Sequence, residues 1–148
     1  FSPEPSILKI NTDDSCFGNL GISGFGGFIR NHHGNWIQGF LGCYGFMSNI
    51  ITELIAIHQG LHIAKSNGFQ FIVCESDSNF ALHLFQESVP LAPLVDNIQS
   101  LITSQWSISF SHTLRKGNKV ADWLAKVGAS SSYGIRLTSF FCLSFYSQ

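Results

Sequence analysis

Charged residues are scarce in this sequence. Only 11% of the 148 residues are Asp, Glu, Lys or Arg, the formal net charge is −1, and 45% of the residues are apolar. This composition argues against a disordered chain and favours one compact domain with a substantial core. It also lacks the general positive charge that would hold a protein to nucleic acid, so any phosphate contact needs a local basic patch or metal ions.

Paired cysteines and long apolar runs are absent as well. The four cysteines are widely spaced and form no CxxC motif, which argues against structural zinc. We therefore expect small buried thiols in a reducing, intracellular setting. No run approaches the roughly 18–20 apolar residues of a membrane span, so we expect no membrane partner, and a monomer. The chain shows no signal peptide and opens at Phe1 rather than at methionine, as a fragment or a trimmed product would.

The spacing of apolar residues predicts an alternation of strands and helices after a loose lead-in at residues 1–6. Three strands joined by glycine-containing turns come first, at 7–13, 26–31 and 36–45. Helical periodicity follows at 49–68, then a nearly all-apolar strand at 69–77. Two helices, a strand and a last helix are expected at 78–86, 94–105, 106–114 and 117–128. This order predicts an α/β domain over 7–128, a mixed sheet flanked by helices, and leaves the tail at 129–148 unassigned.

Four of the nine carboxylates fall at strand ends or in the first turns of predicted helices. They are Asp13, Glu53, Asp77 and Asp122. Each alone is more readily a turn residue, a cap or a partner of a helix dipole. Together at one edge of a sheet they would repel one another strongly. A hard divalent cation such as Mg²⁺ or Mn²⁺ would relieve that repulsion, because such ions prefer oxygen ligands.

Four local motifs, in order, resemble the ribonuclease H-like family. They are NTDDS at 11–15, TELIAIHQGL at 52–61, CESDS at 74–78 and GNKVADWLAK at 117–126. The resemblance covers about residues 7–127 and is strongest to the plant branch related to non-LTR retroelement reverse transcriptases. It implies a five-stranded mixed sheet whose first three strands are antiparallel, in agreement with the order read from periodicity.

The resemblance also implies a function and a site. The family's metal-binding, catalytic carboxylates fall on Asp13, Glu53, Asp77 and Asp122, and its assisting histidine on His112. In the family two Mg²⁺ or Mn²⁺ ions serve the hydrolysis of phosphodiester bonds. The implied activity is that of a metal-dependent endoribonuclease, and the implied partner is an RNA–DNA hybrid whose RNA strand is cut. A plain strand histidine is the alternative for His112.

Polar and basic residues beside these motifs are candidates for nucleic-acid contact, with ordinary surface solvation as the alternative. The candidates are Asn11, Ser15, Ser78, Arg115, Lys116, Asn118 and Lys119.

Two other functions stay open on the sequence. Asp14 stands where the family usually has glycine, and its side chain would crowd the turn or add charge near the metals. A catalytically impaired, retroelement-derived module that binds nucleic acid or a protein partner is therefore one alternative. A nuclease or integrase acting on DNA is the other.

Overall fold

A computed structural model describes residues 7–17, 21–68, 71–78, 107–113 and 118–138 of the chain. The predicted helices at 78–86 and 94–105 lie outside these residues, apart from Ser78. The order of elements is β1 (Ile7–Phe17), β2 (Ile22–Arg30), β3 (Trp36–Phe46), α1 (Asn49–Ser66), β4 (Phe71–Ser76), β5 (Ser107–His112), α4 (Lys119–Ala129) and β6 (Gly134–Thr138). The mixed sheet with flanking helices predicted from the sequence is confirmed.

The sheet has the strand order β5-β4-β1-β2-β3-β6. The strands β1, β2 and β3 form an antiparallel meander, and β4 and β5 extend it in parallel from β1. Six strands are present among the described residues where five were expected, because residues 134–138 of the unassigned tail pair antiparallel with β3. That pairing satisfies backbone groups that β3 would otherwise expose at the edge of the sheet.

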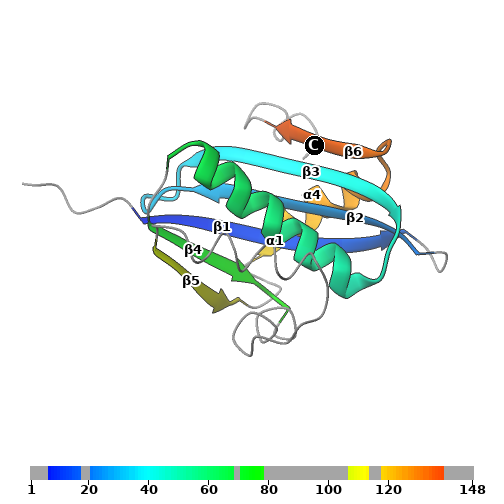
Figure 1. Cartoon of the computed structure of the whole chain (residues 1–148), viewed down its shortest axis with the longest axis horizontal. Coiled ribbons are helices and arrows are strands. Elements are labelled where there is room, and N and C mark those ends of the chain that lie inside the picture. The colour runs from blue at the N-terminus through cyan, green and yellow to red at the C-terminus, as the bar shows by residue number, and fades with distance from the viewer. Residues whose placement is uncertain (1–6, 18–20, 69–70, 79–106, 114–117, 139–148) are drawn as a thin grey trace, which may run out of the picture.

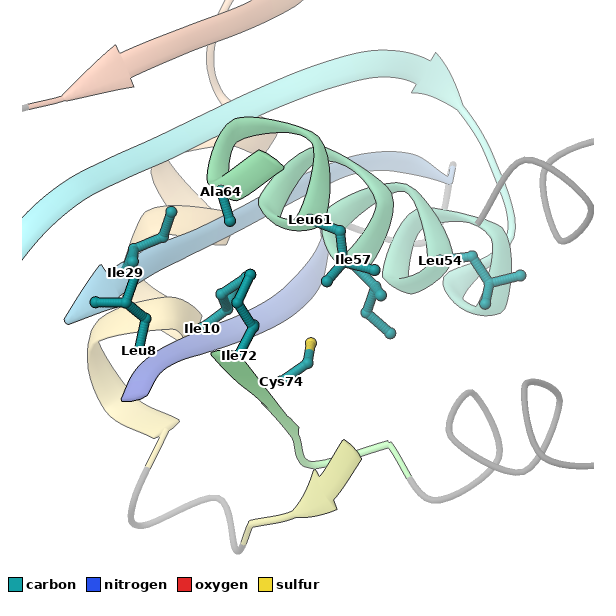
Figure 2. Packing of buried hydrophobic residues seen from close by; sticks show 9 residues of the cluster. All are labelled: Leu8, Ile10, Ile29, Leu54, Ile57, Leu61, Ala64, Ile72 and Cys74. Carbon is teal, nitrogen blue, oxygen red and sulfur yellow. The ribbon is translucent and has the colours of Figure 1, made fainter. Parts of the chain in front are cut away.

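The two described helices cover opposite faces of the sheet, with α1 in front and α4 behind (Figure 1). On the α1 face, Leu8 and Ile10 of β1 join the apolar residues Leu54, Ile57 and Leu61 of α1 in one buried cluster (Figure 2). Strand residues alternate between faces, so the odd-numbered residues of β1 point to the α4 side. This alternation decides which side chains can meet at the site.

The glycines of β2 allow α4 to approach the sheet closely. The sequence predicted a glycine-containing turn followed by a strand at 26–31, but β2 already begins at Ile22. A Cβ on Gly26 would lie 2.5 Å from the backbone nitrogen of Ala125, and one on Gly24 would clash with Ala129. Only glycine leaves room for the backbone of α4 there, so these residues mark helix packing and not a turn.

The N-terminal cap of α1 is Ser48, whose Oγ accepts a hydrogen bond from the Ile51 amide at 3.4 Å. Among the cysteines, Cys43 and Cys74 are buried as expected, but Cys16 is exposed. Neither described helix is long and apolar enough to cross a membrane.

Candidate functional site

Three carboxylates from three elements converge at one place in the sheet. Asp13 lies on β1, Glu53 on α1, and Asp77 directly after β4. The residues before the two aspartates, Thr12 and Ser76, are paired across the parallel strands. One oxygen of each of the three carboxylates lies within 4.8 Å of the others. The convergence therefore follows from strand pairing and from the placement of α1 over β1.

Asp13 and Asp14 point to opposite faces of the sheet. Asp13 is paired with Gly26, against which α4 packs, and Asp14 is paired with Phe25, which packs against α1. Both aspartates lie within β1, which continues to residue 17 rather than ending at Asp13 as expected. The longer strand results from continued pairing with β2. Asp14 thereby faces the helix that carries Glu53.

Glu53 is almost completely buried, with 1% of its surface exposed. Its Oε1 accepts hydrogen bonds from Thr12 Oγ1 at 3.2 Å and from Ser76 Oγ at 2.7 Å. No donor from the described residues reaches Oε2. Burial raises the pKa of Glu53 well above its ordinary value, and the neighbouring carboxyl of Asp14 raises it further. A buried carboxylate with one oxygen lacking a donor is costly unless a proton or a cation reaches it.

The negative charge of Asp13 is also unfavourable in its environment. Its side chain is 6% exposed, and its Oδ1 accepts the amide of Asp14 at 2.9 Å. Burial, followed by the charge of Asp77, raises the pKa of Asp13 to about 8. Asp14 and Asp122 add smaller contributions in the same direction. The site therefore favours a proton or a metal ion over a set of bare negative charges.

Asp122, in the first turn of α4, stands slightly apart from the three. It lines the same open cavity of about 550 Å³ as Asp13 and Asp77, but it is not within the 4.8 Å group. Its Oδ2 lies 2.9 Å from Lys126 Nζ, and both side chains are substantially exposed. Three of the four predicted carboxylates, Asp13, Asp77 and Asp122, thus line one cavity. Glu53 is buried, and one of its oxygens lies within 4.8 Å of those of Asp13 and Asp77.

His112 ends β5, paired with Ser76 across the parallel strands. The ring is exposed, and its Nε2 lies 3.3 Å from the backbone carbonyl oxygen of Asp77. With the proton on Nε2, the ring donates to that carbonyl. His112 is therefore adjacent to the backbone that presents Asp77.

The predicted nucleic-acid contacts separate into three groups. Ser15, Ser78 and Lys119 line the cavity. Arg115 and Lys116 lie outside the described residues. The remaining two, Asn11 and Asn118, are 0% and 1% exposed and are hydrogen-bonded to protein groups. Buried side chains of this kind are not available to a nucleic acid, which corrects the expectation for these two.

Residues that the sequence did not single out complete the site. Thr12 and Ser76 hold Glu53, and Lys126 pairs with Asp122. A signal was present for Thr12, because it follows Leu8 and Ile10 with a period of two and so must face α1. A buried hydroxyl at that position needs a polar partner from the helix.

The comparisons with known proteins agree with this geometry. Residues 11–128 match the family model described as reverse transcriptase-like. An Arabidopsis thaliana protein named for ribonuclease H is 31% identical over 137 residues, which is 90% of this chain and 22% of that protein. The chain thus spans about a fifth of the length of that relative.

Two solved structures share the fold. RNase H1 from Halobacterium salinarum superimposes with a TM-score of 0.77 and 21% identity, over 85% of this chain and 99% of that one. LC11-RNase H1, determined in complex with an RNA/DNA hybrid, gives a TM-score of 0.72 and 20% identity, over 84% and 96% of the two chains. The chain therefore belongs to the reverse transcriptase-like family and carries a ribonuclease H-like domain.

Proposed function

We propose that this domain is a metal-dependent endoribonuclease that cuts the RNA strand of an RNA–DNA hybrid. The observation that carries the proposal is the carboxylate cluster of Asp13, Glu53 and Asp77. Asp13 and Glu53 are buried, Asp77 is half-buried, and one oxygen of each lies within 4.8 Å of the others. Structural ion pairs do not explain this arrangement, because three like charges so close together, two of them buried, destabilise the fold. A functional requirement for divalent cations does explain it.

The donor set fits Mg²⁺ or Mn²⁺. All the donors are carboxylate oxygens, which such hard ions prefer. Glu53 Oε2 is buried and receives no hydrogen bond from the described residues, so it is available to an ion. Asp13, Glu53 and Asp77 would hold the metal, and Asp122 would complete the set from α4. Two bound ions would activate the attacking water and stabilise the leaving oxygen.

The residues of the chain prepare the site in distinct ways. Thr12 and Ser76 fix Oε1 of Glu53 and so orient its second oxygen. Lys119 and Lys126 line the cavity, where their ammonium groups suit the phosphates of a substrate strand. His112 lies beside Asp77 and is placed to accept or donate a proton at the edge of the site.

The substrate class follows from the ribonuclease H resemblance together with the open shape of the cavity. LC11-RNase H1, which has this fold, binds an RNA/DNA hybrid. Recognition of such a duplex depends on its shape and on 2′-hydroxyl groups rather than on base sequence. That requirement is compatible with a chain that carries few basic residues.

The test is cleavage of an end-labelled hybrid in Mg²⁺ and in Mn²⁺. We expect products from the RNA strand with the wild-type chain and none with Asp77→Asn or Glu53→Gln, because each substitution removes a negatively charged carboxylate ligand of the metal. Lys65→Gln, at the far end of α1, is the control and should cleave normally. The proposal fails if the folded wild-type protein cuts in neither metal, or if Asp77→Asn cuts as well as the wild type.

An impaired module that binds without cutting is the second candidate, and Asp14 favours it. Its carboxyl group acts on Glu53 from the α1 face and raises the pKa of that ligand. The signature of this alternative is hybrid binding without turnover, with cleavage gained in Asp14→Gly. A DNA duplex included in the same assay tests the third possibility, a nuclease acting on DNA.

A further inference from the structure

A chain of buried polar side chains lies behind the site, on the α4 face of the sheet. Asn11 of β1 donates from Nδ2 to Glu75 Oε2 at 2.9 Å and to Asn118 Oδ1 at 3.3 Å. Its Oδ1 accepts from Arg30 Nε at 3.1 Å. Asn118 in turn donates from Nδ2 to the backbone oxygen of Thr12 at 2.7 Å. The chain thus runs from charged residues at one end to the residue before Asp13 at the other.

The two charged residues of this chain, Arg30 and Glu75, determine the orientation of the side-chain amides of the two asparagines. Arg30 can only donate, and the ionised Glu75 can only accept, so Asn11 must present its oxygen to the first and its nitrogen to the second. The same Nδ2 of Asn11 also donates to Asn118, so Asn118 must turn its Oδ1 towards Asn11 to accept this hydrogen bond. The nitrogen of Asn118 is left to face the Thr12 carbonyl. Each amide orientation therefore follows from donor and acceptor chemistry.

Asn118 occupies the cap position of α4 without capping it. An asparagine there commonly accepts a hydrogen bond from the first turn of its own helix, but Asn118 makes no such bond. Its side chain instead crosses to the backbone of β1. The start of α4 is thereby tied to the strand directly before Asp13. Asp122 follows Asn118 by four residues, about one helical turn.

We infer that Asn118, oriented by Asn11, is a positioning residue that sets the place of Asp122 relative to Asp13 in the metal site. This inference rests on the proposed function. Asp122 borders the cavity outside the close group of three carboxylates, so its contribution depends on where the first turn of α4 is held. Loss of the tether would let that turn shift and would weaken metal binding, as changes to supporting residues commonly do.

The experiment is titration of the full chain with Mn²⁺ by calorimetry, which reads binding without requiring cleavage. We expect Asn118→Ala to bind Mn²⁺ about tenfold more weakly than the wild type. Ile29→Val is the matched control, because it removes one methylene from the α1-side core, lowers stability and leaves the amide chain intact. Its Mn²⁺ affinity should equal that of the wild type, although its thermal stability falls.

A second variant covers the case in which Asn118→Ala does not fold. Arg30→Met removes the donor that orients Asn11, at a side chain that is 30% exposed and so tolerates replacement. We expect a weakening of roughly threefold, smaller because the hydrogen bonds that Asn11 donates to Glu75 and Asn118 remain.

The outcomes separate the inference from the function on which it rests. If the wild type binds Mn²⁺ and the folded Asn118 and Arg30 variants bind it equally well, the positioning role is wrong and the proposed function stands. If Ile29→Val weakens binding as much as Asn118→Ala does, the effect is one of general stability and the inference is again overturned. If the wild type does not bind Mn²⁺, the proposed function and the inference both fail.

Discussion

Replacing Asp13 with asparagine should stabilise the metal-free protein. Asparagine has nearly the same shape, and its Oδ1 can still accept the Asp14 amide that Asp13 accepts at 2.9 Å. What it removes is the negative charge, which burial and the neighbouring Asp77 make unfavourable. The variant therefore separates the cost of the charge from the packing of the side chain.

The size of the effect follows from the pKa of Asp13, which rises from 3.8 to about 8 on folding. Because the folded state holds this proton more tightly, the stability that Asp13 contributes is highest below about pH 4 and is lost as the pH rises towards 8. At about 1.4 kcal/mol per tenfold change in proton affinity, the upper limit is about 6 kcal/mol. Water and counterions entering the open cavity reduce it, and we expect about 2–4 kcal/mol, or roughly 5–15 °C in Tm.

The assay is thermal unfolding in a chelator from pH 5 to pH 8, repeated with Mg²⁺. The wild type should lose stability across this range and Asp13→Asn should lose less, so the difference is largest at pH 8. Mg²⁺ should raise the Tm of the wild type at pH 8, because it binds only the folded state, and should act weakly on the variant. The reasoning is refuted if Asp13→Asn is no more stable than the wild type at pH 8.

Glu75→Gln is a control for which we expect the opposite change in stability. It is the same chemical change on a neighbouring strand, but Glu75 is paired with Lys9 at 3.5 Å and with Arg30 at 3.3 Å. Removing this charge leaves two cations without their partner, so stability should fall. If both variants shift stability in the same direction, general charge repulsion is responsible and not the environment of Asp13.

Two further predictions concern α4. Gly26→Ala should destabilise the fold by several kcal/mol, because its Cβ would lie 2.5 Å from the Ala125 nitrogen. Gly34→Ala, whose Cβ meets no atom within 4 Å, should cost only about 1 kcal/mol for its positive φ. Equal losses of stability in denaturant unfolding would contradict the close approach of α4. Lys126→Gln should change stability by less than about 0.5 kcal/mol, because the ion pair of Lys126 with Asp122 is exposed. If Lys126 competes with the metal for Asp122, the variant should lower the half-saturating Mg²⁺ concentration of cleavage about twofold. An increase in that concentration would count against this competition.

The main features of the fold were predictable because they depend on local periodicity. The alternation in β1 and the helical spacing of Leu54, Ile57 and Leu61 are present in the sequence, and they place α1 over β1. The positions of the acidic residues along the predicted elements led us to expect that they lie close together, and Asp13, Glu53 and Asp77 do. Strand β6 was not predictable, since its residues 134–138 lack a clear period and gain their structure from the exposed edge of β3.

Other features depend on tertiary contacts that no local pattern contains. The glycines of β2 look like turn residues until α4 is placed against them. Asn118 looks like a helix cap or a substrate contact, but its partners are 106 and 107 residues away in the sequence. The opposite directions of Asp13 and Asp14, in contrast, could have been read from strand alternation once β1 was known to extend beyond Asp13.

The central claim is that Asp13, Glu53 and Asp77 form a metal centre. Its most direct test is an anomalous difference map from crystals of the chain soaked in Mn²⁺. We predict a peak at about 2.0–2.2 Å from oxygens of these three carboxylates, with Glu53 Oε2 among the ligands. A well-ordered site without such a peak, or Mn²⁺ bound only elsewhere on the protein, would contradict it.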